Sequence, residues 1–221
     1  MNNKNGFTLA EVLITLGIIG VVAAMTMPVL ITNIRNTELQ SRFKKTTAEL
    51  QAALQKVQFD EGQTIYGNYT GNGNNIAKII VKQFKAPATY HFNPSELRNN
   101  KLNGRDLIYK HYNGSDFSGW ALDDGTIIVN DNFFIFVNND GYSLTGYRIY
   151  IDTNGYKKPN KEGYDLFKFC LKPNDRLDYN CDEYTQKAFT EKDYFKNLPR
   201  WYFFFTLLKK YSTMNFVCCS V

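Results

Sequence analysis

Few residues of this sequence have the types and the spacing that chemistry requires. Its two histidines, His91 and His111, lie in separate segments, whereas a zinc site or an acid–base pair needs such side chains grouped together. The sequence contains no glycine-rich phosphate loop and no Cys-x-x-Cys pair. It therefore predicts that both histidines are ordinary surface or packing residues and that the protein is not an enzyme.

The most pointed group of oxygen-bearing side chains lies between residues 152 and 165. Asp152 and Asn154 form the D-x-N opening of a calcium loop, and Asp165 could close the loop with backbone carbonyls between them. The full EF-hand pattern is absent, because Gly155 comes too early and no Glu stands at the closing position. An ordinary turn after a strand gives the same residues. Ca²⁺ is therefore a candidate ligand beside the plainer interpretation of a turn.

Glu11 is the only ionisable side chain between Phe7 and Ile31, a run of 25 residues. A helix of that length crosses a hydrocarbon layer of ~30 Å. A carboxylate inside such a stretch costs roughly 2.5–3.5 kcal/mol, which indicates a functional role. A secretory signal peptide has a shorter apolar region that ends at small residues. An ordinary single-pass anchor explains the length of the run but leaves Glu11 unexplained.

The residues before and after Phe7 follow a specific order. The segment from Lys4 to Glu11 reads KNGFTLAE, and it resembles the processing site of type IV prepilins and type II secretion pseudopilins. That family has a short hydrophilic leader, a Gly before the cut, usually a Phe after it, and a Glu five residues into the mature chain. The resemblance implies that a prepilin peptidase of the inner membrane cleaves after Gly6 and methylates the new amino group of Phe7.

The resemblance also implies a role in assembly for Glu11. Cleavage leaves a positive amine on Phe7, and in a packed filament the Glu11 carboxylate of one subunit can pair with that amine of its neighbour. Because apolar contact between helices is non-directional, this pair could set the axial register. In that family the N-terminal helix loosens at positions that match Gly17, Gly20 and Pro28 of this sequence. Pro28 also lacks a backbone N–H donor.

The chain divides into several predicted parts. Residues 1–6 are the leader, 7–31 the transmembrane and assembly half of a long helix, and 32–62 its amphipathic half. Residues 63–200 form a β-rich head, and 201–221 an aromatic tail of uncertain structure, which could be a buried terminal segment, an edge strand or an interface patch. In the amphipathic half a narrow apolar stripe recurs with a helical period, at Ile34, Leu39, Phe43, Leu50, Ala53, Leu54 and Val57.

The head is predicted to be mostly β-structure. Apolar residues every three or four positions predict a short helix at 76–85. The Asp124–Gly125 turn predicts a hairpin between residues 120–122 and 126–129. No repeated helix separates the strands, which favours an antiparallel meander. The fold class is therefore α+β, with a long N-terminal helix packed on an antiparallel sheet, as the resemblance also implies. Further strands are predicted at 133–137, 147–151 and 166–171.

The four cysteines form two groups near the C-terminal end. Cys170 and Cys181 bracket a short loop, and a head exported to an oxidising compartment could close it. Many type IV pilins have a C-terminal disulfide loop, so the resemblance implies the same pairing. Two free buried thiols are the alternative. Cys218 and Cys219 are adjacent and seldom bridge each other.

The predicted function is that of a structural subunit of a type IV pilus or a type II secretion pseudopilus. The subunit is expected in the inner membrane as a single-pass protein with its head on the outer side. Its expected partners are the prepilin peptidase and N-methylase, other pilin or pseudopilin subunits, and an inner-membrane assembly platform. The alternative is a DNA- or ligand-binding minor pilin of a competence or adhesion system. The net charge of +5 is scattered, so the sequence does not favour nucleic-acid binding.

Overall fold

The computed structural model describes residues 8–62, 64–68, 73–130, 132–138, 147–179, 181 and 185. The chain falls into two compact units, Met1–Glu38 and Leu39–Val221, and each is described here by itself. Gly6, Phe7 and the tail with Cys218 and Cys219 lie outside the described residues. The first described residue is therefore Thr8, next to the predicted cleavage site.

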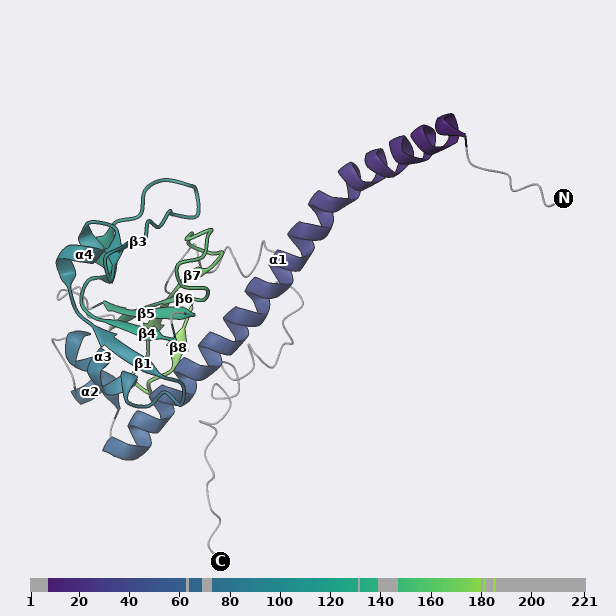
Figure 1. Ribbon diagram of the computed structural model, residues 1–221. Helices are drawn as coiled ribbons and strands as arrows, with labels where there is room; N and C mark the ends of the chain where they lie inside the picture. Colours follow the sequence, from purple (N-terminus) through teal and green to yellow (C-terminus); the bar gives the residue numbers. More distant parts are fainter. Residues whose placement is uncertain are drawn as a thin grey trace, which may run out of the picture. The chain divides into compact units, whose positions relative to one another are not determined.

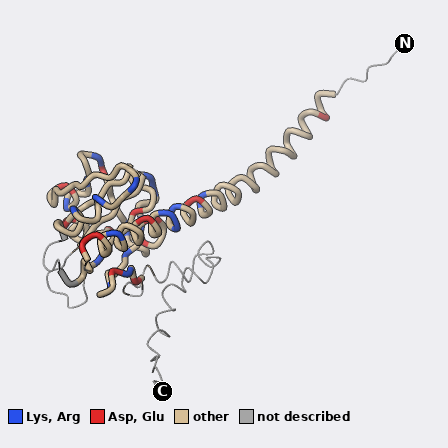
Figure 2. The backbone as a smooth tube through the Cα atoms, turned by 90° about the horizontal axis from the view of Figure 1, so that it is seen from below, with Lys and Arg blue, Asp and Glu red and all other residues tan. Residues whose placement is uncertain are grey.

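Helix α1 (Leu9–Glu61) contributes residues to both units. Its apolar beginning lies in the first unit. After Glu11, its charged residues begin at Arg35, and the predicted boundary of the amphipathic half at residue 32 stays a prediction. Figure 2 shows charged residues gathered on that later part of α1, with a single acidic residue near the start of the helix. The change of composition thus separates a stretch suited to lipid or other apolar helices from a stretch with one solvated face.

The second unit is built on an antiparallel six-stranded sheet in which every neighbouring pair of strands is antiparallel (Figure 1). The predicted strands at 133–137, 147–151 and 166–171 are confirmed to within a residue or so. In spatial order the strands are β1 (Ala88–His91), β4 (Thr126–Val129), β5 (Phe133–Asn138), β6 (Arg148–Asp152), β7 (Leu166–Leu171) and β8 (Leu177–Asp178).

The apolar stripe of α1 covers one face of this sheet. Phe43 packs edge-on against Phe167 of β7, with ring centroids 4.7 Å apart. Leu50, Leu54 and Val57 are fully buried in the same cluster. The predicted packing of the long helix on an antiparallel sheet is confirmed. Two shorter helices, α2 (Ile65–Asn68) and α3 (Gly73–Val81), also contribute buried residues to this cluster.

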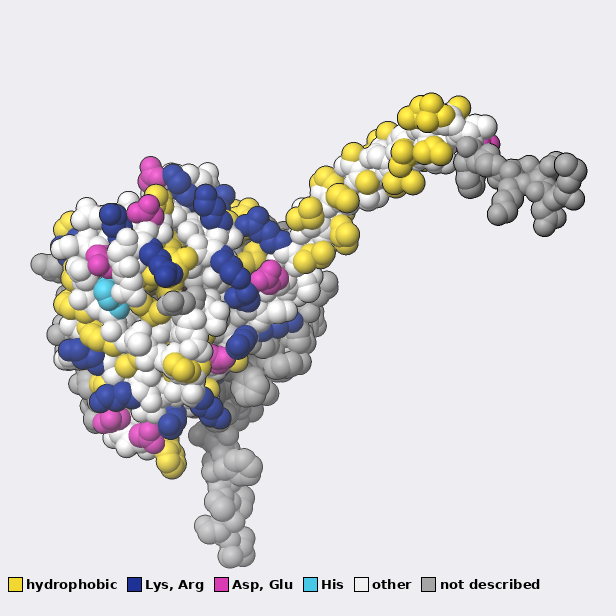
Figure 3. Space-filling model, in the orientation of Figure 1, with side chains coloured by type: hydrophobic (Ala, Val, Ile, Leu, Met, Phe, Trp, Pro, Cys, Tyr) yellow, Lys and Arg dark blue, Asp and Glu magenta, His cyan; other side chains and the backbone are white. Residues whose placement is uncertain are grey.

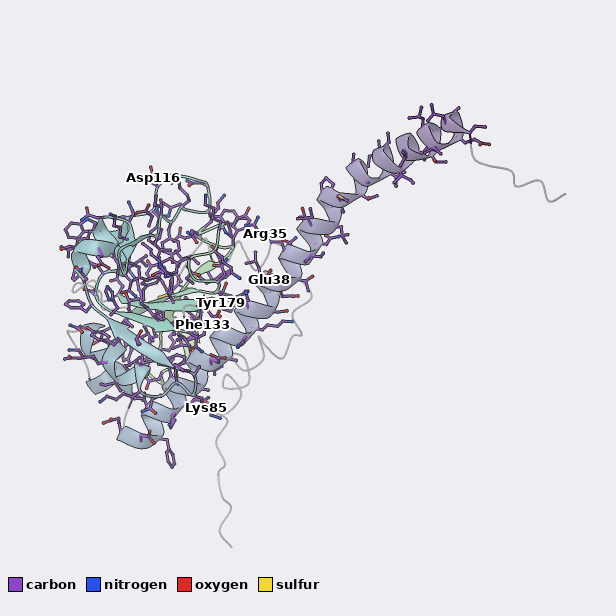
Figure 4. All side chains as sticks on the ribbon, viewed as in Figure 1. Arg35, Glu38, Lys85, Asp116, Phe133 and Tyr179 are labelled. Atoms are coloured by element: carbon purple, nitrogen blue, oxygen red, sulfur yellow. A yellow bond between two sulfur atoms is a disulfide. The ribbon has the colours of Figure 1, made fainter. Side chains whose placement is uncertain are left out.

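The other face of the sheet is buried as well, which explains why β4 and β5 are apolar at almost every position. Phe134 and Phe136 of β5 point into a second cluster, whereas Phe133 and Ile135 belong to the cluster under α1. Side chains fill the space on both faces of the sheet (Figure 4). This second face is covered by α4 (Pro94–Arg98), the hairpin of β2 (Lys101–Leu102) and β3 (Arg105–Asp106), and the 3-10 helix η1 (Gly119–Leu122).

Two predictions about local structure are wrong, and a predicted helix has different bounds. Residues 120–122 form η1 instead of a strand, because Leu122 packs into the second cluster and the Ala121 carbonyl accepts a hydrogen bond from Asn138 Nδ2 at 2.7 Å. Strand β4 pairs with β1 and β5 instead. The helix predicted at 76–85 begins and ends earlier, as α3. Ile34, predicted to belong to the buried stripe, is exposed in the first unit.

Candidate functional site

The start of α1 holds Glu11 in a reciprocal pair of contacts with Thr8. The Glu11 backbone N–H donates to Thr8 Oγ1 at 3.3 Å. The Glu11 carboxylate accepts hydrogen bonds from the Thr8 backbone N–H and from the Thr8 hydroxyl, each at 2.8 Å. This is a capping box, in which the first residue before the helix and the third residue within it satisfy each other. In a single chain the Glu11 carboxylate therefore has a local partner, and the helix has a defined beginning.

The part of α1 after Glu11 exposes apolar side chains all round the helix, with large residues such as Leu13, Ile18 and Met25 each more than half exposed. Figure 3 shows this run of hydrophobic side chains. The threonine hydroxyls in it donate to carbonyls of their own helix, for example Thr26 to Val22 and Thr32 to Pro28. Because each of these hydroxyl hydrogens is bonded within its own helix, it needs no acceptor from outside the helix. The helix is long and apolar enough to cross a membrane.

The predicted helix-loosening residues lie within α1, and the helix does not end at any of them. A side chain added at Gly17 or at Gly20 would meet no atom within 4 Å. No contact within the described chain therefore requires glycine there, whereas close approach of another helix would. Pro28 removes one helical hydrogen bond without ending the helix. Loosening of this stretch in an assembled filament stays a prediction.

A comparison with protein families finds one match in this region. The model of the prokaryotic N-terminal methylation motif matches residues 1–27. Residues 1–27 are a prepilin signal of the type IV pilin and pseudopilin class. No curated protein and no solved structure is similar enough to this chain to be matched.

The prepilin signal covers the predicted cleavage residues and most of the exposed apolar stretch of α1, and the match ends just before Pro28. The positions of Gly6, Phe7 and Glu11 are predicted from the order of residues in the signal, and their individual roles stay predictions. The geometry adds the capping box, which the sequence analysis missed. Its signal was the T-x-x-E spacing of Thr8 and Glu11 before an apolar run.

In the head, the structure brings the predicted calcium residues together in the loop between β6 and β7. Asp152 accepts hydrogen bonds from the backbone N–H groups of Asn154 and Gly155, both at 2.9 Å, and from the Tyr109 hydroxyl. Asp165 accepts hydrogen bonds from the backbone N–H groups of Asn160 at 2.7 Å and of Lys161 at 2.6 Å. Both carboxylates therefore hold the loop in shape, as the turn interpretation predicts.

Burial changes the protonation of these two carboxyl groups. Removal from water raises the pKa of Asp165 to about 6. Removal from water and the negative charge of Asp165 together raise the pKa of Asp152 well above its usual range. Burial and the charge of Asp152 likewise raise the pKa of Tyr109 well above its usual range. Two adjacent buried carboxylates are unfavourable together, so a proton or a cation stabilises this loop.

The residues fit calcium in part. Asn154 Oδ1 and Asn160 Oδ1 are buried and have no hydrogen-bond partner, and amide oxygens beside carboxylates are ordinary calcium ligands. The carboxylate oxygens of Asp152 and Asp165 already accept hydrogen bonds from backbone N–H groups. A bound ion would have to share these oxygens with those donors. Among the residues that the structure describes, no group of three or more His, Cys, Asp or Glu side chains could hold a metal. Calcium binding stays a prediction.

Cys170 and Cys181 are joined in a disulfide, with Cα atoms 6.0 Å apart. Inside the loop that they close, the buried Asp175 carboxylate accepts the N–H groups of Ile65 at 2.7 Å and Tyr66 at 3.0 Å, at the start of α2. Gln51 of α1 donates to the Asp175 carbonyl at 3.2 Å. The disulfide loop therefore ties β7, α1 and α2 together. No local pattern of residues marks these contacts, because the partners are more than a hundred residues apart.

Each histidine pairs with a carboxylate rather than with the other histidine. His91 Nε2 lies 3.0 Å from Glu96 Oε2, and His111 Nδ1 lies 2.6 Å from Glu162 Oε2. The two pairs belong to different parts of the head, at the start of α4 and in the β6–β7 loop. Each pair connects neighbouring segments of the surface, which is the packing role that the sequence predicts.

Proposed function

We propose that the chain is a structural subunit of a type IV pilus or a type II secretion pseudopilus, which a prepilin peptidase processes and which polymerises through its N-terminal helix. One observation carries this proposal. The prepilin signal is followed directly by a helix whose apolar side chains are exposed on every side. Such a surface is stable only against lipid or against other apolar helices. The membrane and then the filament core supply these two environments in turn.

The role of Glu11 follows from what it would exchange on assembly. In the single chain its carboxylate accepts hydrogen bonds from Thr8. Cleavage after Gly6 would place a charged amine on Phe7, one residue before Thr8. In a filament the Glu11 carboxylate of one subunit would form an ion pair with the Phe7 amine of the next. The two opposite charges would neutralise each other in a low dielectric. The pair would fix how far one helix is displaced along another.

The location and partners follow from the same proposal. The helix would hold the subunit in the inner membrane as a single span, with the head on the outer side. There the disulfide of Cys170 and Cys181 is stable. The prepilin peptidase, which also methylates the new amine, other pilin or pseudopilin subunits and an assembly platform would act on the chain in that order. The proposed role is structural, which the match of residues 1–27 to the methylation motif supports.

Replacement of Glu11 tests the proposal. We expect Glu11→Gln to be inserted and processed normally and to yield at least about tenfold fewer filaments in cells with the assembly machinery, because the buried amine then lacks its counter-charge. Glu49→Gln is the matched control, since Glu49 lies on the same helix and, among the described residues, forms its ion pair with the exposed Lys45 at 3.9 Å. Wild-type amounts of filament from Glu11→Gln would contradict the proposal.

A further inference from the structure

An aromatic ring and a guanidinium group form a fixed pair on the outside of the head. Trp120 of η1 is 63% exposed. The Arg98 guanidinium of α4 lies 3.8 Å from the centre of the Trp120 ring. Arg98 Nε donates to the buried carboxylate of Asp123 at 2.5 Å. The pair, here called the Trp120 surface, is thus held from below and open to solvent above.

The backbone under the Trp120 surface cannot shift easily. A Cβ atom at Gly119 would lie 1.9 Å from the carbonyl oxygen of Leu97, so η1 packs directly on α4 and requires glycine there. The carbonyl of Ala121 is held by Asn138 of β5 at 2.7 Å. A rigid, exposed Trp beside an Arg is the combination most enriched at the energetic centres of protein interfaces. A side chain held in place in advance also loses little entropy on binding.

The last turn of α1 is a second exposed feature that its own chain does not explain. Phe59 is 87% exposed, and Asp60 and Glu61 beside it are exposed as well. No basic residue lies in this last turn. Carboxylates at a helix C-terminus are unfavourable, because that end of the helix carries partial negative charge. These three residues, here called the α1 tip, offer an apolar ring and two negative charges to a partner.

The Trp120 surface and the α1 tip complement each other. The Trp120 ring could pack against the ring of Phe59. The Nη groups of Arg98 have no acceptor among the described residues, since Asp123 takes Nε, and they match the carboxylates of Asp60 and Glu61. Both features belong to the unit Leu39–Val221. Figure 1 shows α4 and the end of α1 at opposite ends of the head, so they cannot meet within one chain.

We infer that the Trp120 surface of one copy of this chain binds the α1 tip of the next. Two different patches at opposite ends of one molecule make a heterologous contact, which repeats from copy to copy and builds an open filament when the rotation between copies does not close a ring. The inference rests on the proposed function as a filament subunit and adds the head-to-head contact outside the membrane. The basic side is supplied by Arg98 and the acidic side by Asp60 and Glu61.

A charge exchange in the full-length chain tests the inference. We expect Arg98→Glu alone, and Asp60→Arg with Glu61→Arg, each to reduce the filaments sheared from cells at least about tenfold. We expect the combination of all three substitutions to restore most of the loss. Arg105→Glu is the matched control, because the exposed Arg105 also lies over an aromatic ring, that of Tyr156 at 5.0 Å.

Each result decides the matter. Normal filaments from Arg98→Glu, or a combined variant no better than its parents, would overturn the inference. The Glu11→Gln variant separates the two proposals. If Glu11→Gln fails to assemble while Arg98→Glu assembles normally, the filament proposal stands and only this contact between heads is removed. If a reversal variant does not fold, cross-linking replaces it. Ser118→Cys with Gln58→Cys, two exposed neighbours of the patches, should give a ladder of linked subunits, and its absence would overturn the inference.

Discussion

The buried carboxyl pair in the β6–β7 loop predicts an unusual dependence of stability on pH. Asp152→Asn is the informative change. Its remaining oxygen can still accept the N–H groups of Asn154 and Gly155, and its new amide can donate to the Tyr109 oxygen, which turns its own hydrogen elsewhere. The substitution therefore removes one negative charge and keeps the shape of the loop. The pKa of Asp165 should stay raised, because burial raises it, whereas the contribution of Asp152 itself should disappear.

The magnitude follows from Asp165, whose pKa burial raises from 3.8 to about 6. A carboxyl group with a raised pKa in the folded protein contributes stability below its unfolded pKa and loses that contribution as pH rises through the folded one. The shift corresponds to about 3 kcal/mol of unfolding free energy lost between about pH 4 and pH 7. Asp152, whose pKa is raised further, adds a loss of the same sign at higher pH.

Urea unfolding of a soluble fragment that begins at Thr32, followed by tryptophan fluorescence, measures the effect. With a chelator present, we expect the unfolding free energy of the wild type to fall between about pH 4 and pH 7 and to keep falling at higher pH, and that of Asp152→Asn to fall only over the first range. Asp116→Asn is the control, because Lys110 lowers the pKa of this exposed carboxyl group and no gain at neutral pH is expected. A wild-type stability that stays level or rises between about pH 4 and pH 7 would refute the reasoning.

Calcium enters the same experiment as a separate arm. If Ca²⁺ is a ligand of Asp152 and Asp165, calcium at millimolar levels should raise the melting temperature of the wild-type fragment at neutral pH and leave that of Asp152→Asn unchanged. The two carboxylates would then be neutralised by the ion instead of by a proton. An unchanged wild-type melting temperature would show that the calcium hypothesis is wrong and leave the loop as a turn.

Three further predictions concern the stability of the head, each measured by urea unfolding of the same fragment. Gly119→Ala should lower the unfolding free energy by about 3 kcal/mol, because its Cβ would lie 1.9 Å from the Leu97 carbonyl oxygen; an unchanged midpoint would contradict that packing. Asp175→Ala should cost about 2 kcal/mol through the loss of the α2 cap, with Asp175→Asn costing less. Cys170→Ser with Cys181→Ser should cost about 3 kcal/mol, and a reductant should have no further effect on that variant.

The sequence predicted what is encoded locally or by period. The prepilin signal, the apolar run after Glu11 and the stripe from Leu39 to Val57 are patterns of neighbouring residues, and the structure agrees with the stripe because one face of a helix is buried as a unit. The later strands were also predicted correctly. A short apolar run between turn residues, such as Leu166–Leu171, has few ways other than a sheet to pair its backbone hydrogen-bonding groups.

What the sequence did not predict depends on residues that are distant along the chain. The Asp124–Gly125 turn suggested a hairpin, yet Leu122 is required in the core on the far face of the sheet, so the preceding residues form a 3-10 helix. Asp175 caps a helix more than a hundred residues earlier, and no local pattern marks it. The fixed position of Trp120 likewise depends on the contact between η1 and α4.

The central claim is that the chain is processed as a prepilin and assembled through the helix that processing creates. Mass spectrometry of the subunit from sheared filaments or membranes tests this most directly. We predict a chain that begins at Phe7 and carries one methyl group on its amine, with Gly6 variants retaining the leader. A subunit that still begins at Met1 would contradict the account, and so would one cut after Ala24, where the small residues Ala23 and Ala24 could imitate a signal-peptide site.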